Sequence, residues 1–177
     1  MSPPSRLPSG RVQAKHAATN PAITSASAPA PARATGSACQ LLTVQMAATV
    51  ETAPVIKQDL PTLCNYRSSD TTEELIFGSK GAPARVFPIE VADAKKCAAK
   101  PTGCGVASVS LKYPVSGLGE TSISGCSLGE NGNSSEDAVS WVKGGKVFSV
   151  LNGGRVCTEE HQQAVIALAK KLAEEVG

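Results

Sequence analysis

Acidic residues are absent from the first 38 residues of this chain, and aromatic residues are scarce throughout. Aromatics make up 3% of the sequence, and all of them lie beyond residue 38: Tyr66, Phe77, Phe87, Tyr113, Trp141 and Phe148. A segment without aromatic side chains and rich in Pro, Ala and Ser cannot build a packed core. Half of the 12 prolines fall in it. We therefore predict a disordered Pro/Ala/Ser-rich tether over residues 1–38 and a single domain over residues 39–177.

Long apolar runs are also missing. No stretch of about 18 apolar residues is present, so the sequence predicts no transmembrane helix. The first 38 residues contain no apolar core of a signal peptide either. Three explanations remain open: a start upstream of Met1, a signal that has been removed, or a cytosolic protein with free thiols. We favour export by one of the first two, because the tether has the composition of a segment that follows a secretion signal.

Charge is unevenly distributed. The tether carries four basic residues and no acid, which leaves 13 basic and 15 acidic residues in the rest of the chain. The basic residues are Arg6, Arg11, Lys15 and Arg33. At about 1 kcal/mol each near an anionic surface, they are too few for a strong anchor. The domain has no basic stripe with aromatics, so we expect no nucleic acid partner. Any contact with a membrane would be made only through the tether.

Motifs that carry chemistry are absent as well. Neither a Cys-x-x-Cys nor a His-x-x-x-His pair occurs, and the cysteine intervals do not match zinc sites. Ser140-Trp-Val-Lys143 matches a Ser-x-x-Lys motif, but on a strand these two side chains point to opposite faces. His161 is expected to be an exposed residue on a helix surface. Asn133-Ser-Ser135 fits a glycosylation sequon in a polar loop. We predict no catalytic residue, no cofactor and no metal.

Six cysteines stand out against these absences, and all of them lie from Cys39 onward. They are typical of an exported domain stabilised by disulfides. Six cysteines can pair in fifteen ways, and the sequence alone does not decide between them. The pairing that we favour is Cys39–Cys64, Cys97–Cys104 and Cys126–Cys157. These would tie the first helix to the first strand, close a short loop, and tie a strand to the last helix. Free buried thiols and a metal site are the alternatives.

The clearest structural pattern is a hairpin centred on Gly144-Gly145, the type of pair that suits a primed turn. Counting outward pairs Trp141 with Phe148 and Val139 with Val150 on one face, and Ser140 with Ser149 on the other. The alternation predicts that the aromatic pair is buried and that the serines are exposed.

The remaining elements follow from periodicity and caps. We expect helices at about 44–52 with Thr43 as N-cap, at 90–100, and from Thr158 to the C-terminus. We expect strands at 64–67, 74–77, 106–113 and 121–128, and a loop at 78–83. The last helix has an apolar face that needs a surface to cover, and the Trp141 face of the hairpin fits it. The predicted fold class is α+β, an antiparallel sheet with helices packed on one face, stapled by disulfides.

Three short motifs carry a resemblance. Cys39-Gln-Leu-Leu-Thr43, Cys64-Asn-Tyr66 and Gly117-Leu-Gly119-Glu120, followed by the hairpin and an Ala-rich helix, resemble a family of small actinobacterial secreted and lipoprotein domains of unknown function. The resemblance implies an α+β domain, a bridge between Cys39 and Cys64, and attachment to the outer face of the membrane. It implies no catalytic residues. Met46 stands where the family usually has an acidic residue, and the other four cysteines are additional to the common pair.

The expected function is a non-enzymatic, extracytoplasmic binding or interaction module of the cell envelope, acting as a monomer on an envelope protein or a small ligand. A concave apolar pocket beside Tyr113 or Trp141 would favour a small ligand. The open side of the sheet, or loops at 79–87 and 128–137, would favour a protein. The alternatives are a secreted enzyme inhibitor acting through the loop 98–103, an enzyme with His161 in a cleft, and a structural envelope component.

Overall fold

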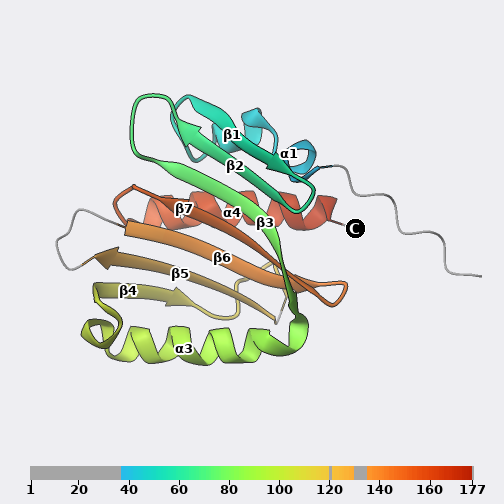
Figure 1. Cartoon of the computed structure of the whole chain (residues 1–177). Helices are drawn as coiled ribbons and strands as arrows, with labels where there is room; N and C mark the ends of the chain where they lie inside the picture. The colour runs from blue at the N-terminus through green and yellow to red at the C-terminus, as the bar shows by residue number, and fades with distance from the viewer. Residues whose placement is uncertain (1–36, 120, 130–134, 177) are drawn as a thin grey trace, which may run out of the picture. The chain divides into compact units, whose positions relative to one another are not determined.

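Seven β-strands form one antiparallel sheet in the order β1-β2-β3-β7-β6-β5-β4 within the part of the chain that the structure describes (Figure 1). This computed structural model describes residues 37–176 except 120 and 130–134. The strands are β1 (Pro54–Leu60), β2 (Leu63–Ser68), β3 (Glu74–Pro83), β4 (Val106–Lys112), β5 (Ser122–Gly129), β6 (Ser135–Lys143) and β7 (Lys146–Gly153). The helices are α1 (Ala38–Leu41), α2 (Val44–Ala47), α3 (Phe87–Ala99) and α4 (Glu159–Glu175), with 3-10 turns η1 (Ala84–Val86) and η2 (Pro101–Cys104). None of these helices is long and apolar enough to cross a membrane.

The central hairpin has the register that the glycine pair predicts. Gly144 and Gly145 both have positive φ, 57° and 74°, as a primed turn requires. Trp141 pairs with Phe148, Val139 with Val150, and Ser140 with Ser149. The prediction that Ser140 is exposed is wrong, because this side chain is only 6% exposed. It lies in a groove beside α3, so the second face of the sheet is partly covered too.

The main core lies between the sheet and α4. The buried face of α4 includes Val165, Leu168, Ala169 and Leu172, and these residues share one apolar cluster with Trp141 and Phe77. The short helices α1 and α2 add Ala38, Leu42 and Ala47 to the same cluster. The predicted α+β fold with an antiparallel sheet and disulfides is confirmed.

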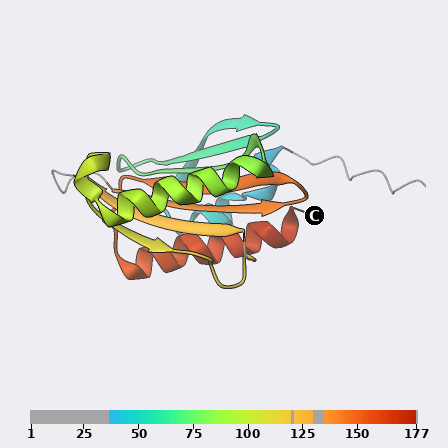
Figure 2. The same cartoon turned by 90° about the horizontal axis from the view of Figure 1, so that it is seen from below.

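Helix α3 lies on the opposite face of the sheet, which the prediction of helices on one face does not include. Its Phe87 and Val91 pack in a second, smaller cluster with Ile123 and Val147. Ile123 follows Ser122, whose partner is Trp141, so its side chain points away from the main core. Helix α3 runs along the β4 end of the sheet in Figure 1 and crosses in front of the strands in Figure 2.

The three disulfides are the pairs that the sequence favours. Cys39–Cys64 joins α1 to β2, Cys97–Cys104 joins α3 to η2, and Cys126–Cys157 joins β5 to the segment before α4. Their Cα atoms are 4.9, 5.7 and 5.8 Å apart, within the range that a disulfide spans.

Both predicted helix caps are present. Thr43 Oγ1 accepts a hydrogen bond from the Met46 amide at 3.3 Å, and Thr158 Oγ1 accepts one from the His161 amide at 3.1 Å. The helix after Thr43 is shorter than predicted and ends at Ala47. The chain then reverses, with Ala53 at φ 47°, and enters the next strand.

One strand was missed, and one predicted loop is wrong. Strand β1 was not predicted, because it is an edge strand with exposed residues on both faces and therefore lacks the alternation of a half-buried strand. The predicted loop at 78–83 is the second half of β3, since Ser79 pairs with Phe148 and Pro83 with Lys146. The predicted tether lies outside the described residues, except for Ser37 and Ala38, and so does Asn133 of the sequon.

Candidate functional site

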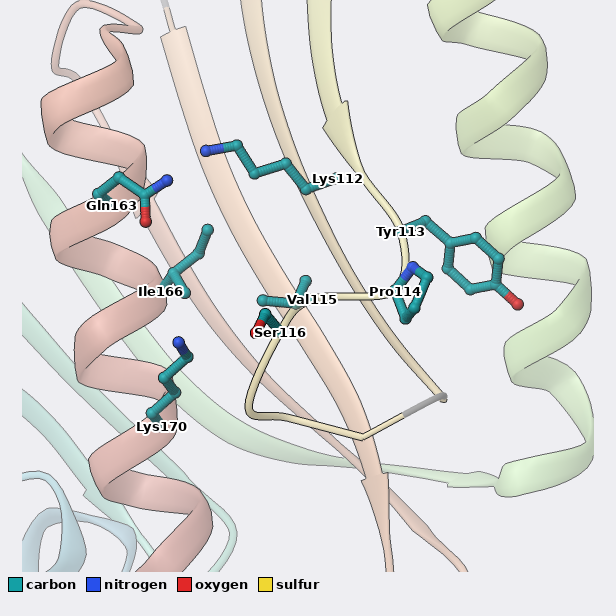
Figure 3. A pocket seen from close by; sticks show the side chains of 8 residues that line it. All are labelled: Lys112, Tyr113, Pro114, Val115, Ser116, Gln163, Ile166 and Lys170. Carbon is teal, nitrogen blue, oxygen red and sulfur yellow. The ribbon is translucent and has the colours of Figure 1, made fainter.

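A pocket of about 370 Å³ lies between the chain that leaves β4 and one face of α4 (Figure 3). The β4 side supplies the consecutive residues Lys112 to Ser116, which include a cis peptide bond between Tyr113 and Pro114. Helix α4 supplies Gln163, Ile166 and Lys170. These three side chains share one face because they are spaced by three and four residues. The two sides of the pocket thus come from segments far apart in the sequence.

The floor of the pocket is apolar and fixed. Val115 and Ile166 are 4% and 3% exposed, and both belong to the main core. Ser122 stabilises the loop after Pro114. Its Oγ accepts a hydrogen bond from the Val115 amide at 3.0 Å and donates one to the Gly119 carbonyl at 2.6 Å. A pocket wall that is part of the core needs little rearrangement on binding, which favours a preformed site.

Two lysines stand at the pocket, but their surroundings differ. Lys112 Nζ is 2.6 Å from Glu159 Oε1, and Gln163 donates to the same oxygen at 2.9 Å. These hydrogen bonds lower the pKa of Glu159, so the carboxylate stays charged and balances Lys112. Among the described residues, no carboxylate lies within 4.0 Å of Lys170 Nζ. Lys170 therefore has no ion-pair partner among the described residues and can offer its positive charge to a ligand.

Of the two residues predicted to line a pocket, Tyr113 lines this one and Trp141 does not. Tyr113 lies at the pocket edge, 44% exposed, and Lys95 Nζ of α3 lies 4.2 Å from the centre of its ring. Figure 3 shows the ring turned toward α3 and away from the α4 side chains. Trp141 lines neither this pocket nor the groove beside α3. It is 1% exposed and stacks on Phe77 and Phe148 at 6.4 and 5.8 Å, so the prediction for Trp141 is wrong: it is a core residue.

The groove beside α3 has a volume of about 340 Å³ and a different character. Its floor is made by Gly125, Ala138 and Ser140. Because these residues are small, the face of the sheet that α3 covers has a depression at this point. Lys80 and Glu90 stand 3.7 Å apart at its rim, with Asp93 nearby. Since the charges at the rim pair with each other, the groove has no uncompensated cation like Lys170.

A buried polar cluster at the start of α4 was missed by sequence reasoning. His161 is buried, contrary to the prediction of an exposed residue, because the first turn of α4 faces the sheet. Its Nε2 is 2.7 Å from Asn152 Oδ1 and 3.6 Å from Asp137 Oδ2. Asn152 Nδ2 in turn donates to Glu51 Oε1 at 3.2 Å. The available signal was the hairpin register, which places Asp137 opposite Asn152 on the face of Trp141.

Burial shifts the pKa of each titratable group in this cluster toward its neutral form. It raises the pKa of Glu51 to about 7, with the neighbouring Glu73 adding to the effect. It raises the pKa of Asp137 to about 6, against the opposing charge of Lys112. It lowers the pKa of His161, and the positive charge of Arg155 adds to this. His161 and Asp137 lie beside each other, and neither lines the pocket at Lys170 or the groove beside α3.

One group of described residues brings together three atoms that metals can bind. Cys126 Sγ, Cys157 Sγ and a carboxylate oxygen of Asp137 all lie within 4.8 Å of one another. The two sulfur atoms are joined in a disulfide, so neither is available as a thiolate. This group is a disulfide beside a buried carboxyl rather than a metal site.

The loop considered for enzyme inhibition is closed by Cys97–Cys104 and has Lys100, Thr102 and Gly103 exposed. Residues 101–104 of this loop form the 3-10 turn η2. Peptide segments that bind by strand addition are extended, so this turn would have to unfold for that mode of binding.

Comparison with known proteins assigns no family: no protein-family model and no curated protein matches this chain.

Proposed function

We propose that this protein is a non-enzymatic, extracytoplasmic module that binds a small amphiphilic anion in the pocket between Tyr113 and Lys170. The observation that carries the proposal is the combination of an apolar floor with the charge of Lys170 in a cavity of about 370 Å³. Small-molecule sites usually have volumes of about 300–1,000 Å³, with apolar walls and a few polar groups that orient the ligand.

Each lining residue has a separate part in this proposal. Lys170 binds the anionic group, because a charge-assisted hydrogen bond in a partly apolar site is strong. The hydroxyl of Ser116, which also lines the pocket, offers a further donor. The apolar part of the ligand packs on Val115 and Ile166. Lys112 and Gln163 are occupied by Glu159 and shape the far wall.

Two observations favour ligand binding over the alternatives of an enzyme and an enzyme inhibitor. The histidine and carboxyl that an enzyme would use, His161 and Asp137, are buried away from the pocket. The bridged loop that an inhibitor would present is a 3-10 turn rather than an extended segment. A structural role in the envelope needs neither a pocket nor an uncompensated lysine inside it.

The proposed location rests on the three disulfides, which form and persist in oxidising compartments outside the cytoplasm. Attachment to the outer face of the cell membrane through residues 1–38, and action as a monomer, are part of the same proposal. Both come from the composition of the chain and from its resemblance to actinobacterial envelope domains. A slightly acidic domain is a poor partner for nucleic acid.

The experiment is a fluorescence titration with the anionic probe 1-anilinonaphthalene-8-sulfonate, followed by competition with octanoate, octyl phosphate and the neutral octyl glucoside. We expect both anions to displace the probe and the neutral detergent to displace it much less. Lys170→Met keeps the aliphatic stem but removes the charge, and should weaken binding by about tenfold. Lys171→Met is the matched control, because Lys171 is exposed and does not line the pocket.

Three outcomes would contradict the proposal. Equal displacement by the neutral detergent would mean that the site has no preference for anions. An equal loss of affinity in both lysine variants would indicate attraction by the general surface charge. No binding of the probe to the native protein would favour the structural alternative.

A further inference from the structure

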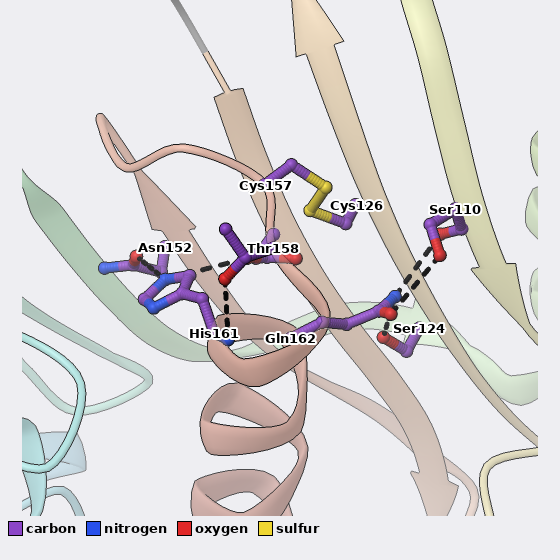
Figure 4. Close-up of a disulfide and its surroundings, with 9 residues drawn as sticks. Ser110, Ser124, Cys126, Asn152, Cys157, Thr158, His161 and Gln162 are labelled. Carbon is purple, nitrogen blue, oxygen red and sulfur yellow. Dashed lines mark hydrogen bonds and ion pairs between the residues drawn. A yellow bond between two sulfur atoms is a disulfide. The ribbon is translucent and has the colours of Figure 1, made fainter.

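The Cys126–Cys157 disulfide lies beside a buried acidic side chain, unlike the other two disulfides. Asp137 is the register partner of Cys126 across β5 and β6. One of its carboxylate oxygens lies within 4.8 Å of both sulfur atoms. Within the described part of the chain, no other group of three Cys, His, Asp or Glu residues is so close. Figure 4 shows this disulfide on the segment that leads into α4, whose first turn carries His161 and Gln162.

The carboxyl group of Asp137 is poorly compensated. It is 4% exposed, and its Oδ1 has no hydrogen-bond partner among the described residues. The nearest basic nitrogen is His161 Nε2, at 3.6 Å from Oδ2, and this nitrogen is already bound to Asn152. An unpaired buried carboxyl is unfavourable for stability, and such groups in native proteins call for an explanation. Its position beside two sulfur atoms suggests a part in their chemistry.

The two cysteines differ in their access to solvent. Cys126 lies on a central strand and is 1% exposed. Cys157 is only half-buried and lies between the exposed Val156 and Thr158, in a segment that is neither helix nor strand. A thiolate arriving from solvent would therefore attack Cys157, and Cys126 would be the sulfur that leaves.

We propose that Cys126–Cys157 is an exchangeable disulfide that reacts with dithiols of other proteins or small molecules, and that Asp137 exchanges a proton with Cys126 Sγ during the reaction. The site is separate from the pocket at Lys170 and does not depend on ligand binding there.

The proposed steps balance. A thiolate of the dithiol attacks Cys157 Sγ, the bond between the two protein sulfurs breaks, and its electron pair goes to Cys126 Sγ, which takes the proton of Asp137. The second thiol of the dithiol loses its proton to solvent and attacks the dithiol sulfur that is bonded to Cys157. A bond forms between the two dithiol sulfurs, and Cys157 leaves as a thiolate. The protein gains two electrons, and the dithiol becomes a disulfide. In the reverse direction, Asp137 takes the proton from Cys126 and generates the attacking thiolate.

Several charged groups face Asp137 and set its behaviour. His161 approaches it from α4, and the charge of Lys112 acts on it from β4. Two more charged groups act one residue further away: Glu51 accepts a hydrogen bond from Asn152, and Arg155 lowers the pKa of His161. Burial raises the pKa of Asp137 to about 6, and Lys112 opposes this shift. The carboxyl can thus donate a proton below about pH 6 and accept one above it.

The test follows the reduction of all three disulfides in the native protein by dithiothreitol between pH 4.5 and 8. Timed samples are alkylated and the labelled peptides are quantified by mass spectrometry, with each rate constant expressed per attacking thiolate. At acidic pH we expect Cys126–Cys157 to be reduced at least about tenfold faster than Cys39–Cys64, which also joins a half-buried to a buried cysteine but, among the described residues, has no carboxylate within 4.8 Å of both sulfur atoms. Its rate constant should fall as the pH rises through about 6, because Asp137 then loses the proton that it donates.

Asp137→Asn should remove this pH dependence and slow the reduction by about tenfold or more. The bridge Cys97–Cys104 in the same molecules is the internal control, and its rate should not change. As a second variant, Cys126→Ser leaves a thiol at Cys157, which should form a mixed disulfide with glutathione disulfide without unfolding.

The proposal is wrong if the native protein shows no change in this rate constant between pH 4.5 and 8, a result that needs no variant. It is also wrong if Asp137→Asn slows both bridges equally, or if Cys157 in the Cys126→Ser variant reacts only in denaturant.

Discussion

Gly117 lies directly against the side chain of Lys170: a Cβ atom at position 117 would stand 3.0 Å from Lys170 Cε and 3.2 Å from its Nζ. The loop that closes the pocket therefore fixes the position of the lysine stem. Gly117 also has φ +83°, a conformation that favours glycine.

Gly117→Ala should disturb the pocket without destroying the fold. The new methyl group would push the Lys170 stem aside, and we expect the affinity for the anionic probe to fall about threefold. Gly119→Ala is the matched control, because Gly119 has a similar φ of +88° but no atom within 4 Å of the added Cβ. Both variants should lose about 1 kcal/mol of unfolding free energy from backbone strain. Equal probe affinity in the two variants would mean that the contact with Lys170 is irrelevant to binding.

Trp141 should contribute to stability through its volume rather than its indole nitrogen. Its Nε1 is buried and has no hydrogen-bond partner among the described residues, so Trp141→Phe loses no polar contact within them and should cost less than about 1.5 kcal/mol. Trp141→Ala removes the stacking of the indole on Phe77 and on Phe148 and should cost about 3–5 kcal/mol. Urea unfolding followed by circular dichroism measures both. A similar loss in both variants would indicate an unrecognised partner of the indole.

The buried Glu51 should make stability depend on pH. Its pKa rises from 4.5 to about 7 on folding, so the folded state holds this proton more tightly than the unfolded chain. The resulting stabilisation is fully present below about pH 4.5 and is lost as the pH rises through about 7. His161 acts in the opposite sense, because folding lowers its pKa below 6.5 and favours the unfolded state at acidic pH.

Glu51→Gln separates these contributions, because glutamine cannot titrate but can still accept from Asn152. We expect the difference in unfolding free energy between native protein and variant to change by about 2 kcal/mol from pH 4.5 to pH 8, in favour of the variant at high pH. The exposed Glu174→Gln is the control and should give a constant difference. A constant difference for Glu51→Gln as well would contradict the burial of an ionisable carboxyl at this position.

Thr158 should stabilise the protein as the N-cap of α4. Thr158→Ala removes the hydrogen bond to the His161 amide and should destabilise the protein by about 1 kcal/mol, whereas Thr158→Ser should retain most of it. The substitution should also raise amide hydrogen exchange in the first turn of α4, which carries the buried His161 and Gln162. Unchanged exchange there would show that the side-chain contacts of these two residues hold the turn without its cap.

The sequence predicts the local parts of this fold well. The Gly144-Gly145 turn and the alternation around it fix the register of Trp141 and Phe148, because all the residues involved are close in the chain. The caps at Thr43 and Thr158 are local in the same way. By contrast, β1 has no alternation to detect, since its residues are exposed on both faces.

The candidate site is less predictable because its parts come from distant segments. Tyr113 was identified as a candidate, but Lys170 was not, and only the packing of α4 on the sheet brings the two to one pocket. The burial of His161 depends in the same way on which turn of α4 meets Asn152. These arrangements follow from the rotation of a helix about its axis, which an amphipathic pattern specifies only coarsely.

The apolar clusters on the two faces of the sheet differ in size, so α3 and α4 should differ in the free energy needed to detach them from the sheet. Helix α4 is held by the larger cluster, whereas α3 is held mainly by Phe87 and Val91. Because Cys97–Cys104 closes only a short loop at its end, we expect α3 to detach as a cooperative unit before the sheet opens. In that open state Ile123 and Val147 would be uncovered, so the α3 face is where a partly unfolded molecule would first become prone to self-association.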